Sequence, residues 1–224
     1  CLLGYTDYAS FALEDKMAGS VARVKSFIDA LSTRAALALE MEMAQLRAHA
    51  PADARFDEQG RLHAADMSYV VAHYKKKVYG YDKREVAKYF PLEQTINGLF
   101  KIYEQFLGVK FEQEVVAANA AWDPSVRMLS VRTQDTNEVL GYIVLDLFPR
   151  AFKSGHAYCQ TVLSPLKRPD GTRNPALAMV LANFSVPTVP GSPTLLSMYN
   201  VTTFFHEFGH ALHHVLGRTE LAAT

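Results

Sequence analysis

The segment that most constrains this chain is residues 203–214, TFFHEFGHALHH. His206 and His210 are four positions apart, and on an α-helix such positions differ by about 40° around the axis and about 6 Å along it. Two imidazoles with this spacing can point at one atom. Glu207 lies about 100° around the helix from His206. Phe204 and Phe208 are among the apolar residues that flank the motif, so we expect a largely buried helix here.

The pattern His-Glu-x-x-His on a helix is typical of zinc-dependent peptide hydrolysis. We therefore predict one Zn²⁺ ion on His206 and His210, with Glu207 as the general base that flanks the metal without ligating it. Zinc lowers the pKa of a bound water to about 7, so the motif predicts attack of water on an amide carbonyl. The alternative is an ordinary amphipathic helix with structural histidines. Leu216 occupies the position where a metzincin needs its third histidine, which excludes that subclass.

Composition narrows the possible partners. The 23 Lys and Arg residues balance 23 Asp and Glu residues, so the chain lacks the basic excess typical of nucleic-acid or anionic-membrane binding. No apolar run reaches the length of a membrane span. We predict neither a nucleic-acid nor a membrane partner. Two cysteines in 224 residues do not form a disulfide framework, which favours a reducing compartment.

Periodicity predicts a helical first part and a small sheet afterwards. Helices are expected over residues 6–17, 20–50, 66–78 and 92–107, with a brief helix after Asp82 and a left-handed Gly108. Strands are expected over 127–133, 139–148 and 157–163, while 176–186 fits a strand or a helix. The motif helix is capped by Ser197 or Asn200 and ends at Gly217. The fold class is therefore mainly α with a small β-sheet (α+β).

Several segments resemble the thimet oligopeptidase family of zinc peptidases. Residues 205–213 (FHEFGHALH) are similar to its active-site helix, and residues 89–92, 98–103, 141–150, 153–157 and 178–184 are similar, in order, to its earlier blocks. The resemblance implies a zincin-like catalytic-domain fragment of a mostly helical oligopeptidase, which acts on short peptides and is a monomer at full length. It also implies that Gly155, His156 and Ala157 bind substrate at a sheet edge, where an extended peptide can pair its backbone. His156 as a loop histidine without substrate contact remains the alternative.

The resemblance implies further residues beyond this chain: a glutamate as third zinc ligand, and tyrosine and histidine donors for the oxyanion. Glu220 is not assigned as that ligand. We expect residues 1–224 to be part of one peptidase catalytic region, truncated at both ends, with 1–110 helical and 111–224 holding the small sheet and the zinc helix. Alone, this piece is expected to bind zinc weakly and cleave little.

The function predicted from the sequence is a zinc-dependent metallo-endopeptidase of short peptides. The alternatives are a non-catalytic helical scaffold, a zinc hydrolase of another amide, or a dipeptidyl carboxypeptidase of the same family. The expected compartment is the cytoplasm, with the mitochondrion as the alternative.

Overall fold

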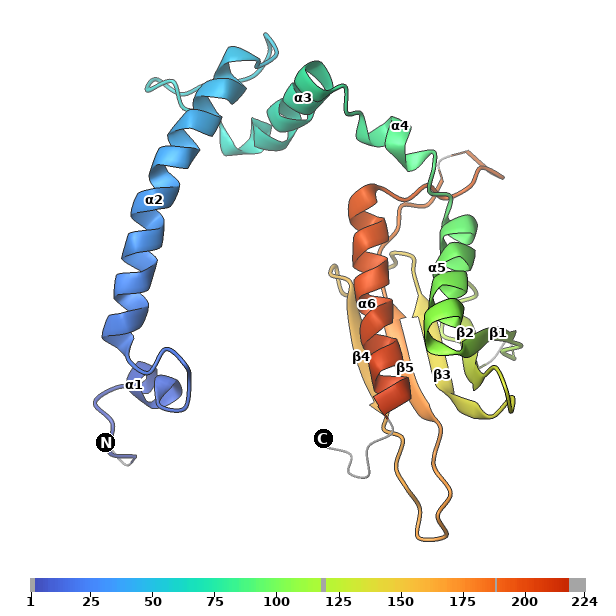
Figure 1. Cartoon of the computed structure of the whole chain (residues 1–224). Coiled ribbons are helices and arrows are strands. Elements are labelled where there is room, and N and C mark those ends of the chain that lie inside the picture. The colour runs from blue at the N-terminus through green and yellow to red at the C-terminus, as the bar shows by residue number, and fades with distance from the viewer. Residues whose placement is uncertain (1–2, 118–119, 188, 218–224) are drawn as a thin grey trace. The chain divides into compact units, whose positions relative to one another are not determined.

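A computed structural model of the chain describes residues 3–117, 120–187 and 189–217. The chain divides into two units, Cys1–Asp82 and Lys83–Thr224. The described part of the first unit is helical, and the second combines helices with a five-stranded sheet (Figure 1). The predicted α+β class is confirmed. No helix in the described ranges is both long and apolar enough to cross a membrane. Glu220 lies outside these ranges.

The first unit contains α1 (Tyr8–Leu13), α2 (Val21–Ala48), a 3₁₀ turn (Ala64–Asp66) and α3 (Met67–Tyr79). Ser20 caps α2, because its side chain accepts a hydrogen bond from the backbone N–H of Arg23. The hydroxyl of Tyr74 donates to Gln45 at 3.0 Å and ties α3 to α2. The long helix predicted over 20–50 and the helix predicted over 66–78 are both confirmed, within two residues at each end.

None of the residues of α2 is buried. Its apolar stripe includes Ile28, Leu31 and Leu39, whose exposed fractions are 54%, 55% and 58%. The helical period was therefore predicted correctly, but within the described residues the middle of this stripe is not covered by another element. The second unit, by contrast, encloses most of the hydrophobic core.

The described residues of the second unit form three helices: α4 (Lys83–Ala87), α5 (Leu92–Leu107) and α6 (Met198–Gly217). Gly108 ends α5 with φ 64°, the left-handed conformation expected at a helix C-terminus. Ser197, rather than Asn200, caps α6, because the Ser197 hydroxyl accepts a hydrogen bond from the Asn200 N–H at 3.2 Å. Backbone hydrogen bonds between residues 90–92 and 194–196 join the starts of α5 and α6.

The sheet has the strand order β1-β2-β3-β5-β4. Its strands are β1 (Val109–Glu114), β2 (Arg127–Thr133), β3 (Val139–Asp146), β4 (Tyr158–Leu163) and β5 (Ala176–Leu181). All pairs are antiparallel except β3 and β5, which are parallel. Residues 176–181 thus form a strand, which resolves the open choice left by their sequence. β1 was not predicted, because Lys110, Glu112 and Glu114 obscure its apolar alternation.

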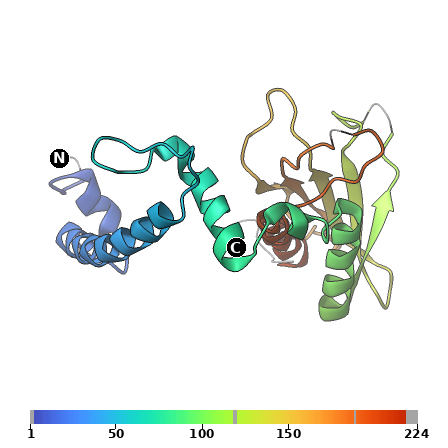
Figure 2. The same cartoon turned by 90° about the horizontal axis from the view of Figure 1, so that it is seen from above.

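Helices α5 and α6 cover the same face of this sheet (Figures 1 and 2). Phe208 of α6 is fully buried between them, with its ring centroid 5.8 Å from that of Phe100 in α5 and 5.5 Å from that of Phe111 in β1. At these separations, aromatic rings add a specific attraction to the area that they bury. The packing therefore fixes the rotation of α6 about its axis, and with it the direction of the opposite face.

Candidate metal centre

His206 and His210 converge on the face of α6 opposite its core residues. Their Nε2 atoms are 3.1 Å apart, and the two rings are nearly perpendicular, at 88°. Both histidines are exposed, while Phe204, Phe208 and Ala211 on the same helix are buried. The expectation of a largely buried helix was therefore wrong for this face, because the apolar residues of α6 occupy only one side.

The direction of the histidine pair is set by contacts on the other side of α6. The rings of Tyr103 and Phe208 stack with centroids 5.8 Å apart. The Tyr103 hydroxyl donates to the backbone carbonyl of Phe205 at 3.5 Å, immediately before His206. α5 thus contacts α6 within the motif itself, and these contacts limit rotation of α6 about its axis.

The distance between the two imidazole nitrogens fits a shared metal ion. Two nitrogen ligands at about 2.05 Å from a tetrahedral zinc ion lie about 3.3 Å from each other. The observed 3.1 Å is close to that separation. A direct Nε2–H···Nε2 hydrogen bond between opposite tautomers has a similar length, so the distance is compatible with either arrangement. Among the described residues, no group of three or more His, Cys, Asp or Glu side chains is placed to hold a metal.

Glu207 lies on the flank of α6 that faces strand β4. Burial raises the pKa of the Cys159 thiol in β4 to about 11, and the negative charge of Glu207 adds to this shift. The carboxylate is therefore close enough to Cys159 to act on its ionisation. Glu207 is half-buried, between the exposed histidine face and the buried core face. The carboxylate therefore remains partly open to solvent.

β4 is the last strand of the sheet, next to β5 and parallel in direction to α6. A hydrogen bond of 2.8 Å joins His214 Nε2 to the carbonyl oxygen of Leu163 at the end of β4. Because a carbonyl only accepts, Nε2 of His214 carries the proton. Sequence reasoning missed this tie, since nothing near His214 indicates that its partner lies 51 residues earlier.

The predicted substrate-binding residues Gly155, His156 and Ala157 lie just before β4. Gly155 and His156 are exposed, and Ala157 is partly buried against the core. Strands advance about 3.3 Å per residue and helices about 1.5 Å. Counted back from the contact between Leu163 and His214, the motif is level with residues 159–161 of β4. Residues 155–157 therefore lie toward the N-terminal end of α6.

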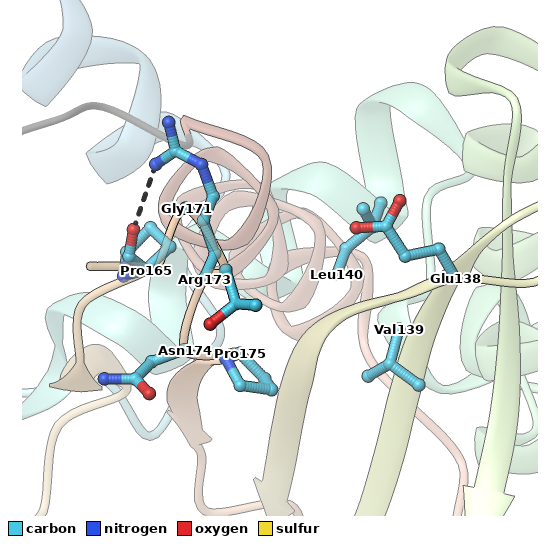
Figure 3. Close-up of a pocket in the computed structure, with 9 residues that line it drawn as sticks. Glu138, Val139, Leu140, Pro165, Gly171, Arg173, Asn174 and Pro175 are labelled. Atoms are coloured by element: carbon cyan, nitrogen blue, oxygen red, sulfur yellow. Dashed lines mark hydrogen bonds between the residues drawn. The ribbon is translucent and has the colours of Figure 1, made fainter. Parts of the chain in front are cut away.

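A pocket of about 430 Å³ lies elsewhere in the second unit (Figure 3). Glu138, Val139 and Leu140 line one side, at the start of β3, and Pro165, Arg173 and Asn174 line the other. The Arg173 guanidinium donates to the carbonyl of Pro165 at 3.3 Å, within the loop that connects β4 to β5. None of the predicted site residues lines the pocket, so it is not part of the candidate centre.

An exposed histidine pair on a helix, with a carboxylate near the outermost strand β4, is an arrangement suited to hydrolytic chemistry. The sequence profile of Peptidase family M3 matches residues 1–224. The chain therefore belongs to peptidase family M3.

Three curated relatives illustrate the similarity. Oligopeptidase A of Escherichia coli (strain K12) is 35% identical over 221 residues, covering 99% of this chain and 32% of the relative. Thimet-like oligopeptidase of Dictyostelium discoideum is 35% identical over 225 residues, covering 96% and 32%. Mitochondrial intermediate peptidase of Vanderwaltozyma polyspora is 29% identical over 251 residues, covering 98% and 31%. The chain thus spans about a third of the length of the curated relatives it matches.

Proposed function

We propose that this chain forms part of a zinc-dependent metallo-endopeptidase that hydrolyses internal bonds of short peptides. The observation that carries the proposal is the 3.1 Å approach of His206 Nε2 and His210 Nε2 on one helical face. Membership of peptidase family M3 supports peptide hydrolysis as the reaction class. The names of the relatives, oligopeptidase A and thimet-like oligopeptidase, support short peptides as substrates.

In this proposal His206 and His210 would hold one Zn²⁺ ion through their Nε2 atoms, and their Nδ1 atoms would carry the protons. When bound, zinc supplies a water of lowered pKa and polarises the carbonyl that is attacked. Glu207 would accept the proton of the attacking water on a carboxylate oxygen and would then deliver it to the departing amine nitrogen. The half-buried position of Glu207 beside β4 supports this role, because a general base has to reach water and substrate from one side.

The outer edge of β4, which pairs with no further strand among the described residues, is proposed to align the substrate. An extended peptide that pairs with an edge strand is held by its backbone, which suits an enzyme acting on varied sequences. Residues 159–161 lie level with the histidine pair, and Gly155, His156 and Ala157 extend the same edge toward the N-terminal end of α6. The bulge between Thr161 and Leu163 limits the length of regular pairing at the other end.

Further parts of the proposal concern the whole protein. For the whole protein we propose a zincin-like topology, a third zinc ligand from outside the chain and a monomeric enzyme. We also propose a cytoplasmic location, with the mitochondrion as the alternative compartment. Weak zinc binding and little cleavage by this chain alone are also part of the proposal, because catalytic zinc takes three protein ligands and the motif supplies two.

Substitution Glu207→Gln in the full-length protein tests the proposal. Because the amide cannot take a proton, peptide turnover is expected to fall by about 10²-fold or more, with zinc content unchanged. The matched control, His210→Gln, is expected to lose both zinc and turnover. Normal turnover of a short fluorogenic peptide by the Glu207→Gln protein would overturn the mechanism. Turnover that survives complete removal of metal would overturn the metal dependence.

A further inference from the structure

A buried ionic cluster lies where β3 and β5 end side by side. The Asp146 and Lys153 side chains are 0% and 2% exposed. Arg150 forms a two-pronged ion pair with the Asp146 carboxylate, at 2.6 Å and 2.7 Å, and the Trp122 indole N–H donates to the same carboxylate at 3.0 Å. Burial alone raises the pKa of Asp146, but these donors and Lys153 outweigh it and lower the pKa to about 2. The carboxylate is therefore ionised at neutral pH.

Lys153 joins three separate segments through its ammonium group. Its Nζ is 2.8 Å from Asp146 Oδ1 and 2.9 Å from the Asp146 carbonyl oxygen. It is also 2.8 Å from the carbonyl oxygen of Phe148 and 2.6 Å from that of Ala182. One cation thus links the end of β3, the turn that follows it and the residue after β5. A buried ammonium is tolerated only when its protons are matched by acceptors in this way.

The residues immediately after Lys153 start the segment that leads into β4. Asn183 adds a second tie, because its side-chain amide donates to the carbonyl oxygen of Ser154 at 2.9 Å. Immediately before Lys153, Phe152 has φ 64°, a left-handed conformation that is unfavourable for a residue with a side chain. Such a conformation persists only where surrounding contacts impose it. The Phe152 ring is fully exposed, so packing of that ring does not impose the bend, whereas the adjacent Lys153 side chain is held by the carbonyls of Phe148 and Ala182.

We propose that Lys153 is a positioning residue, which together with Asn183 holds residues 154–157 in place at the entrance of the edge strand β4. The inference rests on the proposed function, because it assigns the ionic cluster to the alignment of peptide substrate. Arg150 shares the Asp146 carboxylate but has no hydrogen bond to the carbonyls of Phe148 or Ala182. It therefore provides a matched comparison, in which a cation is removed from the same carboxylate without releasing the segment.

Hydrogen exchange on the 224-residue chain tests the positioning role with Lys153→Met, Asn183→Ala and Arg150→Met. In the first two variants, amide exchange at the start of β4, residues 158–160, is expected to rise about tenfold or more, while it stays within about threefold of wild type in Arg150→Met. Unchanged exchange at these residues in Lys153→Met and Asn183→Ala would overturn the inference. An equal rise across β2, β3 and α6 would also overturn it, because Lys153 would then contribute only to global stability. If Lys153→Met fails to fold, Asn183→Ala still decides the outcome, because it removes only the exposed hydrogen bond from the Asn183 amide to the Ser154 carbonyl.

Peptide binding separates positioning from a purely structural role. A short unlabelled peptide is titrated into ¹⁵N-labelled chain carrying Glu207→Gln, and the amide signals of residues 158–163 are followed. Lys153→Met and Asn183→Ala are expected to weaken the affinity about fivefold or more, and Arg150→Met to leave it unchanged. Equal affinity in all variants would refute the positioning role. If the β4 signals do not change on adding peptide to the chain that carries Glu207→Gln alone, the substrate edge of the proposed function is refuted instead. The exchange data would still show whether Lys153 holds the segment.

Discussion

Asp146→Asn is the substitution whose consequences can be worked out furthest from the structure. The buried carboxylate has a pKa of about 2, against an ordinary aspartate value of 3.8. Each tenfold change in proton affinity is worth about 1.36 kcal/mol, so ionised Asp146 stabilises the fold by about 2.4 kcal/mol at pH 7. The neutral amide also removes the carboxylate that pairs with buried Lys153 and with Arg150, and Asp123 remains as a charged neighbour of Arg150 alone. We expect a loss of about 2–4 kcal/mol in the free energy of unfolding at pH 7.

The sign of the pH dependence follows from the lowered pKa. A carboxyl group whose pKa is depressed by folding stabilises the fold above its unfolded value of 3.8, and loses this contribution as the pH falls through about 2. At pH 3 the contribution is expected to be about 1.3 kcal/mol. The difference between wild type and Asp146→Asn should therefore shrink by about 1 kcal/mol between pH 7 and pH 3.

Urea unfolding followed by Trp122 fluorescence measures this difference. Trp122 is the single tryptophan of the chain and contacts Asp146, so its signal reports on the second unit. Asp135→Asn, on the exposed turn between β2 and β3, is the control and should change stability by less than about 0.5 kcal/mol. A destabilisation by Asp146→Asn below about 1 kcal/mol at pH 7, or one that does not depend on pH, would refute the electrostatic argument.

Three further substitutions or reactions test other parts of the second unit. Phe208→Ala removes a fully buried ring and should cost about 3–5 kcal/mol of unfolding free energy, measured by urea denaturation; a cost under about 1 kcal/mol would contradict the assigned core. Gly141→Ala would place a Cβ 2.7 Å from the backbone oxygen of Ala176, so β3 and β5 must separate; we expect a loss of about 2 kcal/mol or more and a lower melting temperature, and wild-type stability would contradict this close approach. The Cys159 thiol has a pKa of about 11, so at pH 8 it is about 10² times less ionised than a thiol of ordinary pKa. We expect it to react with iodoacetamide at least tenfold more slowly than a free thiol, as measured by mass spectrometry of the peptide that contains it. Glu207→Gln should increase this rate, because it removes a negative charge near the thiol.

The sequence by itself determined the features that depend on local geometry. The spacing of His206 and His210 fixed their approach, because the pitch of a helix places positions i and i+4 on one side. Ser20 and Gly108 predicted the start of α2 and the end of α5, since helix termini are specified by the conformations and side chains of a few adjacent residues. Family membership was likewise predicted from short segments, and the match over residues 1–224 confirms it.

Only the tertiary structure decided how distant segments meet. Strand order cannot be derived from the periodicity of each strand, and it is the order β3-β5-β4 that leaves β4 at the edge beside α6. The partners of Lys153 come from residues 146, 148 and 182, and His214 finds its acceptor at Leu163. No local pattern encodes such contacts, because each depends on packing that brings together residues far apart in the chain. The histidine pair is therefore a property of one helix, whereas its relation to a peptide-binding edge is a property of the fold.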